Sequence, residues 1–215
     1  MVQLLMNYKL IKNELDEAFY SNSETKLLKI LKNNSILFYQ LYSRKYGIQP
    51  NFSEVSFGDK YRCDFAWLND NSDGPEWVLV EIEKPKMKLF TKKHEPTADL
   101  NHAIEQLKSW GRYFDHNPGE KKRIFGAVAR FKYILVAGHH EEWAQEYAKE
   151  WRIQHNKDTK IEIRSSDVFY RALELFNKRE DEFWSFKEHP KSLTHSKLED
   201  YWMNYSYFNS WRTIL

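Results

Sequence analysis

Two carboxylates interrupt an otherwise apolar stretch of the chain, and their chemistry needs an explanation. Glu81 and Glu83 follow the apolar run Trp77–Val80 and flank Ile82. Such a run predicts a buried strand, in which an ionised carboxylate without a partner is costly. A third acid, Asp64, lies in the preceding apolar stretch. Coordination of a divalent cation would explain acids placed in this way.

Strand alternation predicts that Glu81 and Glu83 share one face, with Ile82 and Lys84 on the other. If Asp64 points to the same face from a neighbouring strand, three carboxylates converge. Mg²⁺ commonly takes one or two carboxylates together with phosphate oxygens and water. Such ions can activate a water molecule and stabilise the charge that develops on a cleaved phosphodiester.

Acidic residues on a strand can also be explained without a metal, if they lie on a face of the strand that is exposed to water. Two observations weigh against it. The run Trp77–Val80 is too apolar for an exposed strand, and the stretch that carries Asp64 is joined to it by a dense turn, Asn69–Pro75. From the residues alone, a metal site and a solvated face both stay open.

The elements that would position these acids form a predicted antiparallel meander. Residues 52–57 alternate apolar and polar side chains, Gly58-Asp59 has the composition of a turn, and residues 61–68 form the next strand. The turn Asn69–Pro75 leads into the strand 77–84. Pro85 ends that strand, because proline cannot donate to a sheet ladder.

Apolar residues at helical spacing predict several helices around this meander. The predicted helices cover residues 4–19, 23–32 with Ser23 as N-cap, 36–46, 97 or 99 to 114, 141–152, and 167–178 capped by Ser165 or Ser166. Further predicted strands cover residues 123–128, 133–137 and 160–164. The order predicts an α/β fold with a mixed β-sheet flanked by helices.

Composition narrows the class of protein. Lysine and arginine number 33 against 31 acids, so any basic surface for nucleic acid must be local. The single cysteine, Cys63, excludes an internal disulfide and is typical of a reducing compartment. The start lacks the apolar core of a signal peptide, and no apolar run approaches the roughly 20 residues that span a bilayer. We therefore expect a cytoplasmic protein without a membrane partner.

Asp64, Glu81–Lys84 and Gln106 resemble the signature of the PD-(D/E)xK nuclease superfamily. That signature is Asp on one strand, Glu-x-Lys on the next, and often Gln on the following helix. More specifically, three ordered blocks resemble the nuclease domain of Shedu anti-phage defence proteins: Val80–Pro85, Leu89–Lys93 and Leu100–Gln106. The resemblance runs from about Glu24 to Arg164 and implies a restriction-endonuclease-like sheet.

The resemblance implies a role for each acid. Asp64 and Glu81 would bind the catalytic metal, Mg²⁺ or Mn²⁺. Glu83 stands where the superfamily usually has lysine, and some restriction endonucleases share this Glu-x-Glu form. Glu83 would then hold or activate the attacking water, or bind a second ion.

Three further residues have both a catalytic and a plain interpretation. Lys84 would reach the site only through a bulge or a twisted strand end; otherwise it is a surface lysine. Gln106 would orient water or a phosphate from its helix; otherwise it is an exposed helix residue. Glu24 matches an acid that some family members place beside the metal.

Basic residues flank the acidic blocks and would neutralise DNA phosphates. The resemblance favours Lys92 and Lys93 as a nucleic-acid-binding pair. The remaining basic residues are equally well explained as solvated side chains; they are Lys86, Lys88, Lys121, Lys122, Arg123, Arg130 and Lys132.

Other reactive residues receive plain interpretations. His139 and His140 suggest a metal, but neighbours at a helix start do not face one another, so we predict a loop and a first turn. Cys63 is predicted to be a core thiol. Without a Gly-rich phosphate loop, ATP hydrolysis is not expected.

Together these observations predict a nuclease-like domain over residues 1–178 and an aromatic, charged, helical extension over residues 179–215 that packs on the core or on a partner subunit of a homo-oligomer. The predicted function is Mg²⁺-dependent hydrolysis of DNA phosphodiesters in anti-phage defence. One alternative is a nucleic-acid-binding module of the same fold that does not cleave. Another is a regulatory or assembly domain.

Overall fold

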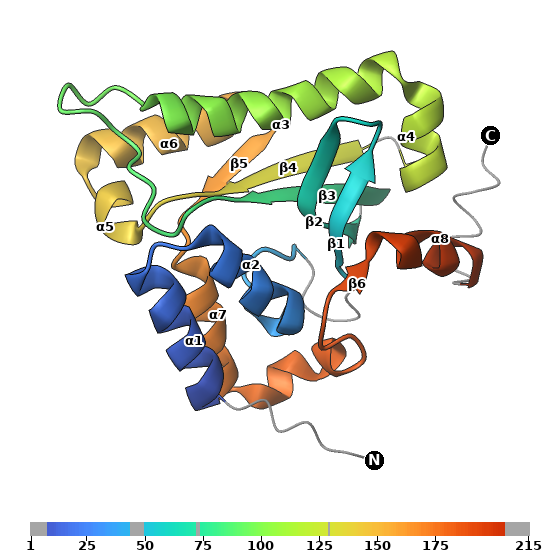
Figure 1. Ribbon diagram of the computed structural model, residues 1–215, viewed down its shortest axis with the longest axis horizontal. Helices are drawn as coiled ribbons and strands as arrows, with labels where there is room; N and C mark the ends of the chain where they lie inside the picture. Colours follow the sequence, from blue (N-terminus) through green and yellow to red (C-terminus); the bar gives the residue numbers. More distant parts are fainter. Residues whose placement is uncertain (1–7, 44–49, 72–73, 129, 205–215) are drawn as a thin grey trace.

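The structure is a computed structural model that describes residues 8–43, 50–71, 74–128 and 130–204. Its elements form three layers, with a central sheet between two groups of helices (Figure 1). Helices α3 and α6 cover one face of the sheet, and α1, α2 and α7 cover the other. Within the described residues, no helix combines the length and the apolar composition needed to cross a membrane.

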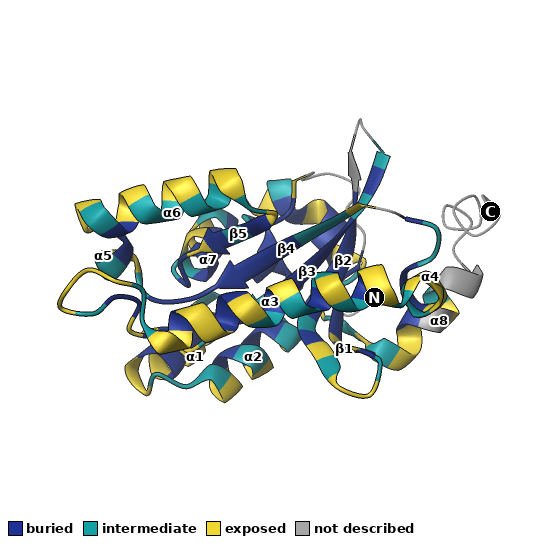
Figure 2. Ribbon diagram, turned by 90° about the horizontal axis from the view of Figure 1, so that it is seen from above, coloured by how far each residue is buried: buried dark blue, intermediate teal, exposed yellow. Residues whose placement is uncertain are grey.

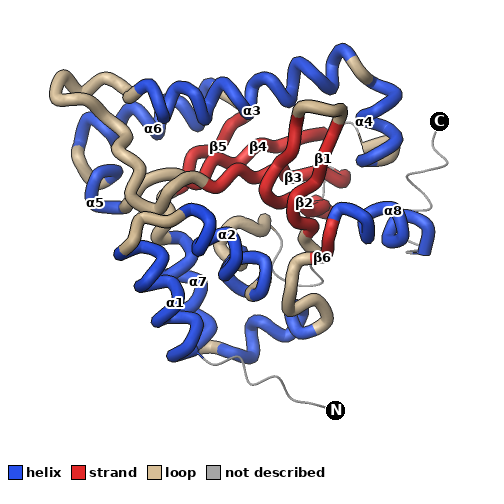
Figure 3. The backbone as a smooth tube through the Cα atoms, viewed as in Figure 1, coloured by secondary structure: helices blue, strands red, loops and turns tan. Residues whose placement is uncertain are grey.

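Six strands make one sheet in the order β5-β4-β3-β2-β1-β6. Their bounds are β1 Phe52–Phe57, β2 Tyr61–Asn71, β3 Gly74–Ile82, β4 Arg130–Val136, β5 Ile161–Arg164 and β6 Leu193–Thr194. The β1–β2 and β2–β3 pairs are antiparallel, whereas β3–β4, β4–β5 and β1–β6 are parallel. The predicted α/β fold with a mixed sheet between helices is therefore confirmed (Figure 3).

Eight α-helices and two 3-10 helices surround the sheet in the described part of the chain, and a serine and a threonine side chain cap the start of two of them. Their bounds are α1 Tyr8–Tyr20, α2 Glu24–Asn33, α3 Ala98–His116, α4 Pro118–Phe125, α5 His140–Trp143, α6 Glu146–Asp158, α7 Val168–Lys178 and α8 His195–Asn204, with 3-10 helices η1 Ser35–Phe38 and η2 Glu180–Lys187. The Thr97 side chain accepts a hydrogen bond from the Leu100 N–H and caps α3. Ser23 caps α2 in the same way, as predicted.

The central strands are buried on both faces, which explains their continuous apolar sequence. Val78, Val80 and Ile82 pack toward α1 and α7, whereas Trp77 and Leu79 pack toward α3. Figure 2 shows the strands of the sheet interior as buried and the outer faces of α3 and α6 as exposed. The predicted alternation of β3 is thus confirmed.

Several predicted elements are wrong in kind or extent. Of the residues 123–128, predicted as a strand, 123–125 form the end of α4, which Pro118 begins, and 126–128 lie in the turn that follows. Ile124 and Phe125 are buried at the end of this helix. The predicted helix 141–152 is two helices, because Gln145 is extended at φ −61° and ψ 136°. The predicted turn 69–75 is shorter, since Asn69 belongs to β2 and Pro75 to β3; residues 72–73 lie outside the described part.

The predicted helix 36–46 is also wrong. The chain forms only the 3-10 helix η1, in which four successive side chains are buried. Successive buried residues cannot share one face of an α-helix, so a helical stripe is absent there. Residues 44–49 lie outside the described part. At the start of α7, the N-cap position belongs to Asp167, not to Ser165 or Ser166.

Candidate active site

Asp64 and Glu81 lie side by side on the α3 face of the sheet. Phe65 pairs with Val80 across the β2–β3 ladder, and both side chains pack toward the α7 layer. Alternation turns the next pair, Asp64 and Glu81, to the opposite face, under α3. The Asp64 Oδ2 atom accepts a hydrogen bond of 2.8 Å from the backbone N–H of Ile82.

Gln106 reaches this pair from the middle of α3. Its Nε2 atom donates to Glu81 Oε1 at 2.5 Å. The other oxygen, Glu81 Oε2, is buried and has no hydrogen-bond partner among the described residues. Gln106 lies on the predicted helix, but its contact with Glu81 was not predicted; its predicted role in orienting water or a phosphate stays a prediction. A buried carboxylate oxygen without a donor is a position that a cation or a water molecule can satisfy.

The acids raise one another's pKa. Burial raises the pKa of Glu81, and the charges of Asp64 and Glu83 raise it further. Burial also raises the pKa of Asp64; the Ile82 N–H lowers it, and Glu24 raises it. Burial, Glu24 and Asp64 together raise the pKa of Glu83 to about 7. The cluster is thus short of positive charge, which is the electrostatic condition that a bound cation relieves.

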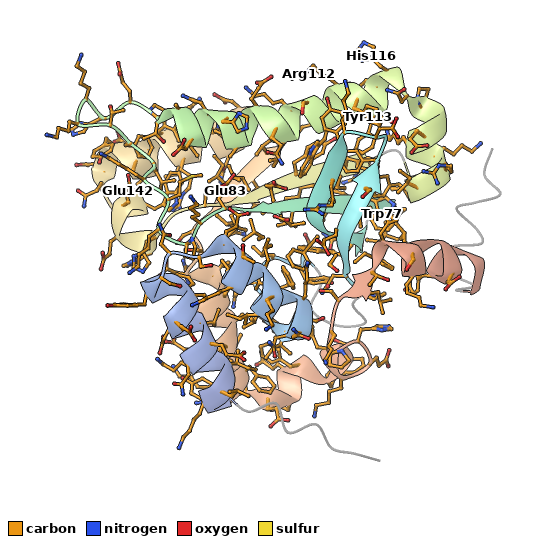
Figure 4. The ribbon with its side chains drawn as sticks, viewed as in Figure 1. Trp77, Glu83, Arg112, Tyr113, His116 and Glu142 are labelled. Atoms are coloured by element: carbon orange, nitrogen blue, oxygen red, sulfur yellow. The ribbon has the colours of Figure 1, made fainter. Side chains whose placement is uncertain are left out.

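Glu83 lies one residue beyond the end of β3. Its backbone N–H donates to the Val136 carbonyl at 2.9 Å, which continues the parallel pairing with β4. The side chain is half-buried. Figure 4 shows it between the α3 layer and the α1–α2 layer. Glu24, the first residue of α2, lies close enough to raise the pKa of all three acids.

A cleft of about 760 Å³ opens over Asp64 and Glu81. Its walls come from α2, from the β1–β2 hairpin and from α3. The polar side chains that line it include Glu24, Asp59, Lys60, Arg62, Asp64, Glu81, His102, Glu105, Gln106 and Ser109. Asp64 and Glu81 therefore line an open cleft together with acidic and basic side chains from three elements.

Sequence reasoning missed the basic residues of this cleft, which are Lys60 and Arg62. Two signals could have found them. Arg62 precedes Asp64 by two residues on one strand and so points to the same face. Lys60 occupies the turn that delivers this strand. On α3, His102 precedes Gln106 by four residues, which places both on one helical face.

The predicted basic residues lie elsewhere. Lys84 is exposed beyond the end of β3, and Lys92 and Lys93 are exposed in the segment between β3 and α3. None of these three lines the cleft. Lys84 lowers the pKa of Glu83 slightly, as the last of its causes. Of the more distant group, Lys132 is ion-paired with Glu162.

The segment between β3 and α3 is nevertheless well anchored. Glu142 Oε1 accepts hydrogen bonds from the backbone N–H groups of Leu89 and Phe90, at 2.8 and 2.9 Å. The Phe90 ring meets three aromatic rings of α5 and α6 edge-on. His94 stacks on Tyr147 at 3.9 Å. Lys92 and Lys93 therefore project from a fixed support.

Cys63 is buried, and burial raises the pKa of its thiol. It lies within the apolar cluster under α3, which confirms the prediction of a core thiol. A buried thiol of raised pKa is a poor nucleophile.

The chain was compared with models of known protein families and with curated proteins. The model of a family described as "Shedu protein SduA, C-terminal" matches residues 21–170. The matched range contains Glu24, Asp64, Glu81, Glu83 and Gln106. No curated protein matches the chain.

Proposed function

The chain belongs to the family of the Shedu protein SduA C-terminal region, and from this premise we propose that it is a divalent-metal-dependent endonuclease that hydrolyses DNA. Membership of the family implies a role in anti-phage defence. One observation supports the nuclease proposal most strongly. Within the described part of the chain, Glu81 Oε2 is buried without a hydrogen-bond partner next to Asp64, at an open cleft lined by more acidic than basic side chains.

The residues of the cleft fit a hard cation. Asp64 and Glu81 offer carboxylate oxygens, which Mg²⁺ and Mn²⁺ prefer. They are the proposed metal ligands. A cation held there would supply a water of lowered pKa and positive charge beside the cleaved phosphodiester.

The chain's own side chains have separate proposed roles. Gln106 fixes the Glu81 carboxylate by its 2.5 Å hydrogen bond to Oε1, which leaves Oε2 for the metal. Glu83 takes the place of the usual lysine and positions the attacking water. Glu24, across the cleft on α2, adds a further acid to the metal side.

We assign DNA contact to two basic groups. Lys60 and Arg62 lie on the wall of the cleft and would bind the phosphates next to the cleaved bond. Lys92 and Lys93, on the anchored segment, would contact phosphates farther along the duplex. Both contacts are electrostatic, so binding should weaken steeply with salt.

A binding module that does not cleave is the second candidate. The observation that favours it is the position of Lys84, which is exposed and does not line the cleft that contains Asp64 and Glu81. A regulatory or assembly role for the C-terminal extension is a third candidate. A loss of subunit association on deletion of residues 205–215, which follow α8 and leave β6 in place, measured by mass, would support it.

Conversion of supercoiled plasmid to nicked and linear forms tests the proposal. We expect cleavage with Mg²⁺ or Mn²⁺ and none with EDTA. Asp64→Asn and Glu81→Gln should abolish cleavage, whereas Glu150→Gln, an exposed acid on α6, should cleave like the wild type. If both cleft variants cleave as well as the wild type, the assignment fails. If wild type binds DNA but never cleaves it, the second candidate is correct.

A further inference from the structure

A second group of metal-ligating side chains lies away from the acidic cleft. His139, His140 and Asp167 each place one ligand atom within 4.8 Å of the other two. Among the described residues, this is the only set of three His, Cys, Asp or Glu side chains that comes so close together. The predicted loop and first turn is confirmed, since His139 is the N-cap of α5 and His140 is its first residue; the approach of both side chains to Asp167 was not predicted. Asp167, distant in sequence, is the residue that unites them.

The fold brings these residues together at the carboxyl ends of two adjacent parallel strands. His139 and His140 follow β4 through Gly138, whose φ of +68° reverses the chain direction. Asp167 follows β5 and precedes α7. The carboxyl edge of a parallel sheet is where α/β proteins place their ligand sites.

The distances suit a shared ion. His139 Nε2 and Asp167 Oδ1 are 3.1 Å apart. Two ligands that each bind zinc at about 2.0–2.2 Å in a tetrahedral arrangement lie roughly 3.3 Å apart. The same 3.1 Å also fits a direct hydrogen bond, so the experiment must separate a metal site from a simple His–Asp pair.

The Asp167 carboxylate is oriented by neighbours, as metal-binding carboxylates are. Its Oδ2 atom accepts hydrogen bonds from the His140 backbone N–H and from Ser165 Oγ, both at 2.5 Å. The His139 ring is held edge-on by Phe19 of α1, with centroids 6.2 Å apart. Oδ1 lies beside His139 Nε2, and in the proposed site these two atoms and the His140 imidazole would bind the ion.

The side of the cluster that faces water is open. The Asp167 and His139 side chains are 18% and 27% exposed, and His140 is exposed. Water can complete four ligands. A site of three protein ligands with one open position is a common zinc arrangement.

We propose that His139, His140 and Asp167 bind a divalent transition-metal ion of the zinc class. Two imidazole nitrogens and one carboxylate oxygen favour Zn²⁺, Co²⁺ or Ni²⁺ over Mg²⁺, which takes oxygen ligands. The chain thus carries two metal sites of different chemistry: an oxygen site in the cleft and a nitrogen-rich site at the strand ends.

This second site braces the backbone that follows Glu83. Ser166, beside Asp167, donates through its hydroxyl to the carbonyls of Pro85 and Gly138, at 2.9 and 2.8 Å. A metal ion bound by His139, His140 and Asp167 would fix the end of β4 relative to the start of α7. Through the Ser166–Pro85 hydrogen bond it would also fix the segment that follows β3. We therefore expect Zn²⁺ to raise the melting temperature.

Calorimetric titration of tag-free, metal-stripped protein with ZnCl₂ in excess MgCl₂ tests the proposal. We expect one equivalent to bind, and at least roughly tenfold weaker binding for His140→Gln. His140 is exposed, so this variant should keep the wild-type circular dichroism. His116→Gln, an exposed histidine of α3, and the double variant Asp64→Asn/Glu81→Gln should bind like the wild type.

Co²⁺ provides an independent readout, since a visible absorption band from a site with nitrogen ligands should appear in wild type and vanish in both His140→Gln and Asp167→Asn. The proposal is overturned if Zn²⁺ does not bind, or if binding survives in both of these variants. It is also overturned if the cleft double variant, not His140→Gln, loses the zinc equivalent.

Discussion

Glu81→Gln should make the metal-free protein more stable at neutral and alkaline pH. The substitution keeps the shape of the side chain and the acceptor for Gln106, and it removes the pH-dependent cost of folding that the raised pKa of Glu81, about 9, imposes. Substitution of a residue that stabilises the fold lowers the free energy of unfolding. Substitution of a residue that is retained for metal binding raises the free energy of unfolding when the metal is absent.

The size and pH dependence follow from the buried carboxylate. The folded-state pKa of Glu81 is raised by burial, so the contribution of this group is fully present below its unfolded value, about 4.3, and is lost as pH rises toward the folded value. A buried unsatisfied polar group costs about 1–3 kcal/mol. Because the new amide nitrogen also lacks a partner, we expect a gain of about 1–2 kcal/mol at pH 8. For a chain of this length that is about 2–8 °C in melting temperature.

The change in melting temperature is measured by thermal unfolding in EDTA at pH 4.5 and pH 8. The measurement is repeated with MgCl₂ at pH 8. Glu81→Gln should match wild type at pH 4.5 and exceed it at pH 8. Mg²⁺ should stabilise wild type and not the variant. Glu150→Gln serves as the control for an exposed charge. If Glu81→Gln is less stable than wild type at pH 8 in EDTA, the carboxylate is a structural group and the reasoning is refuted.

Three further predictions concern the cleft. Glu83→Gln should slow single-turnover plasmid cleavage about 10²-fold, the low end for a group that moves a proton; an unchanged rate would remove Glu83 from the mechanism. Arg62→Gln should weaken DNA binding and lower the slope of log affinity against log salt by about 1, with an unaltered slope as the contrary result. Gly58→Ala should lower the free energy of unfolding in urea by about 1–2 kcal/mol. Gly58 has φ +58°, and a Cβ atom there would lie 2.5 Å from Tyr113 Oη. The control Gly119→Ala, whose Cβ atom would have nothing within 4 Å, should not destabilise the protein.

The face of the sheet on which Asp64 and Glu81 lie could be predicted, because side-chain alternation along a strand depends only on local geometry. Alternation alone placed Glu81 apart from Val80 and Ile82, and the meander brought Asp64 to the neighbouring strand. Helical spacing from Leu100 to Phe114 fixed the face of α3 and therefore the direction of Gln106.

The walls of the cleft could not be predicted, because they depend on packing between distant segments. Glu24 approaches Asp64 only because α2 packs below the sheet, and Lys60 reaches the cleft only because the β1–β2 hairpin leans toward α3. The contact between the His139 and Asp167 side chains depends in the same way on the parallel pairing of β4 and β5. The strand predicted at 123–128 failed because a short apolar pair at a helix end has no distinguishing period.

Crystals grown with Mn²⁺, examined by anomalous scattering, test the central claim most directly. The account predicts a peak within about 2.0–2.3 Å of carboxylate oxygens from both Asp64 and Glu81, with Glu81 Oε2 among them, and no such peak in Glu81→Gln. A map with no manganese at Asp64 and Glu81, from crystals with the cleft open to solvent, would contradict it.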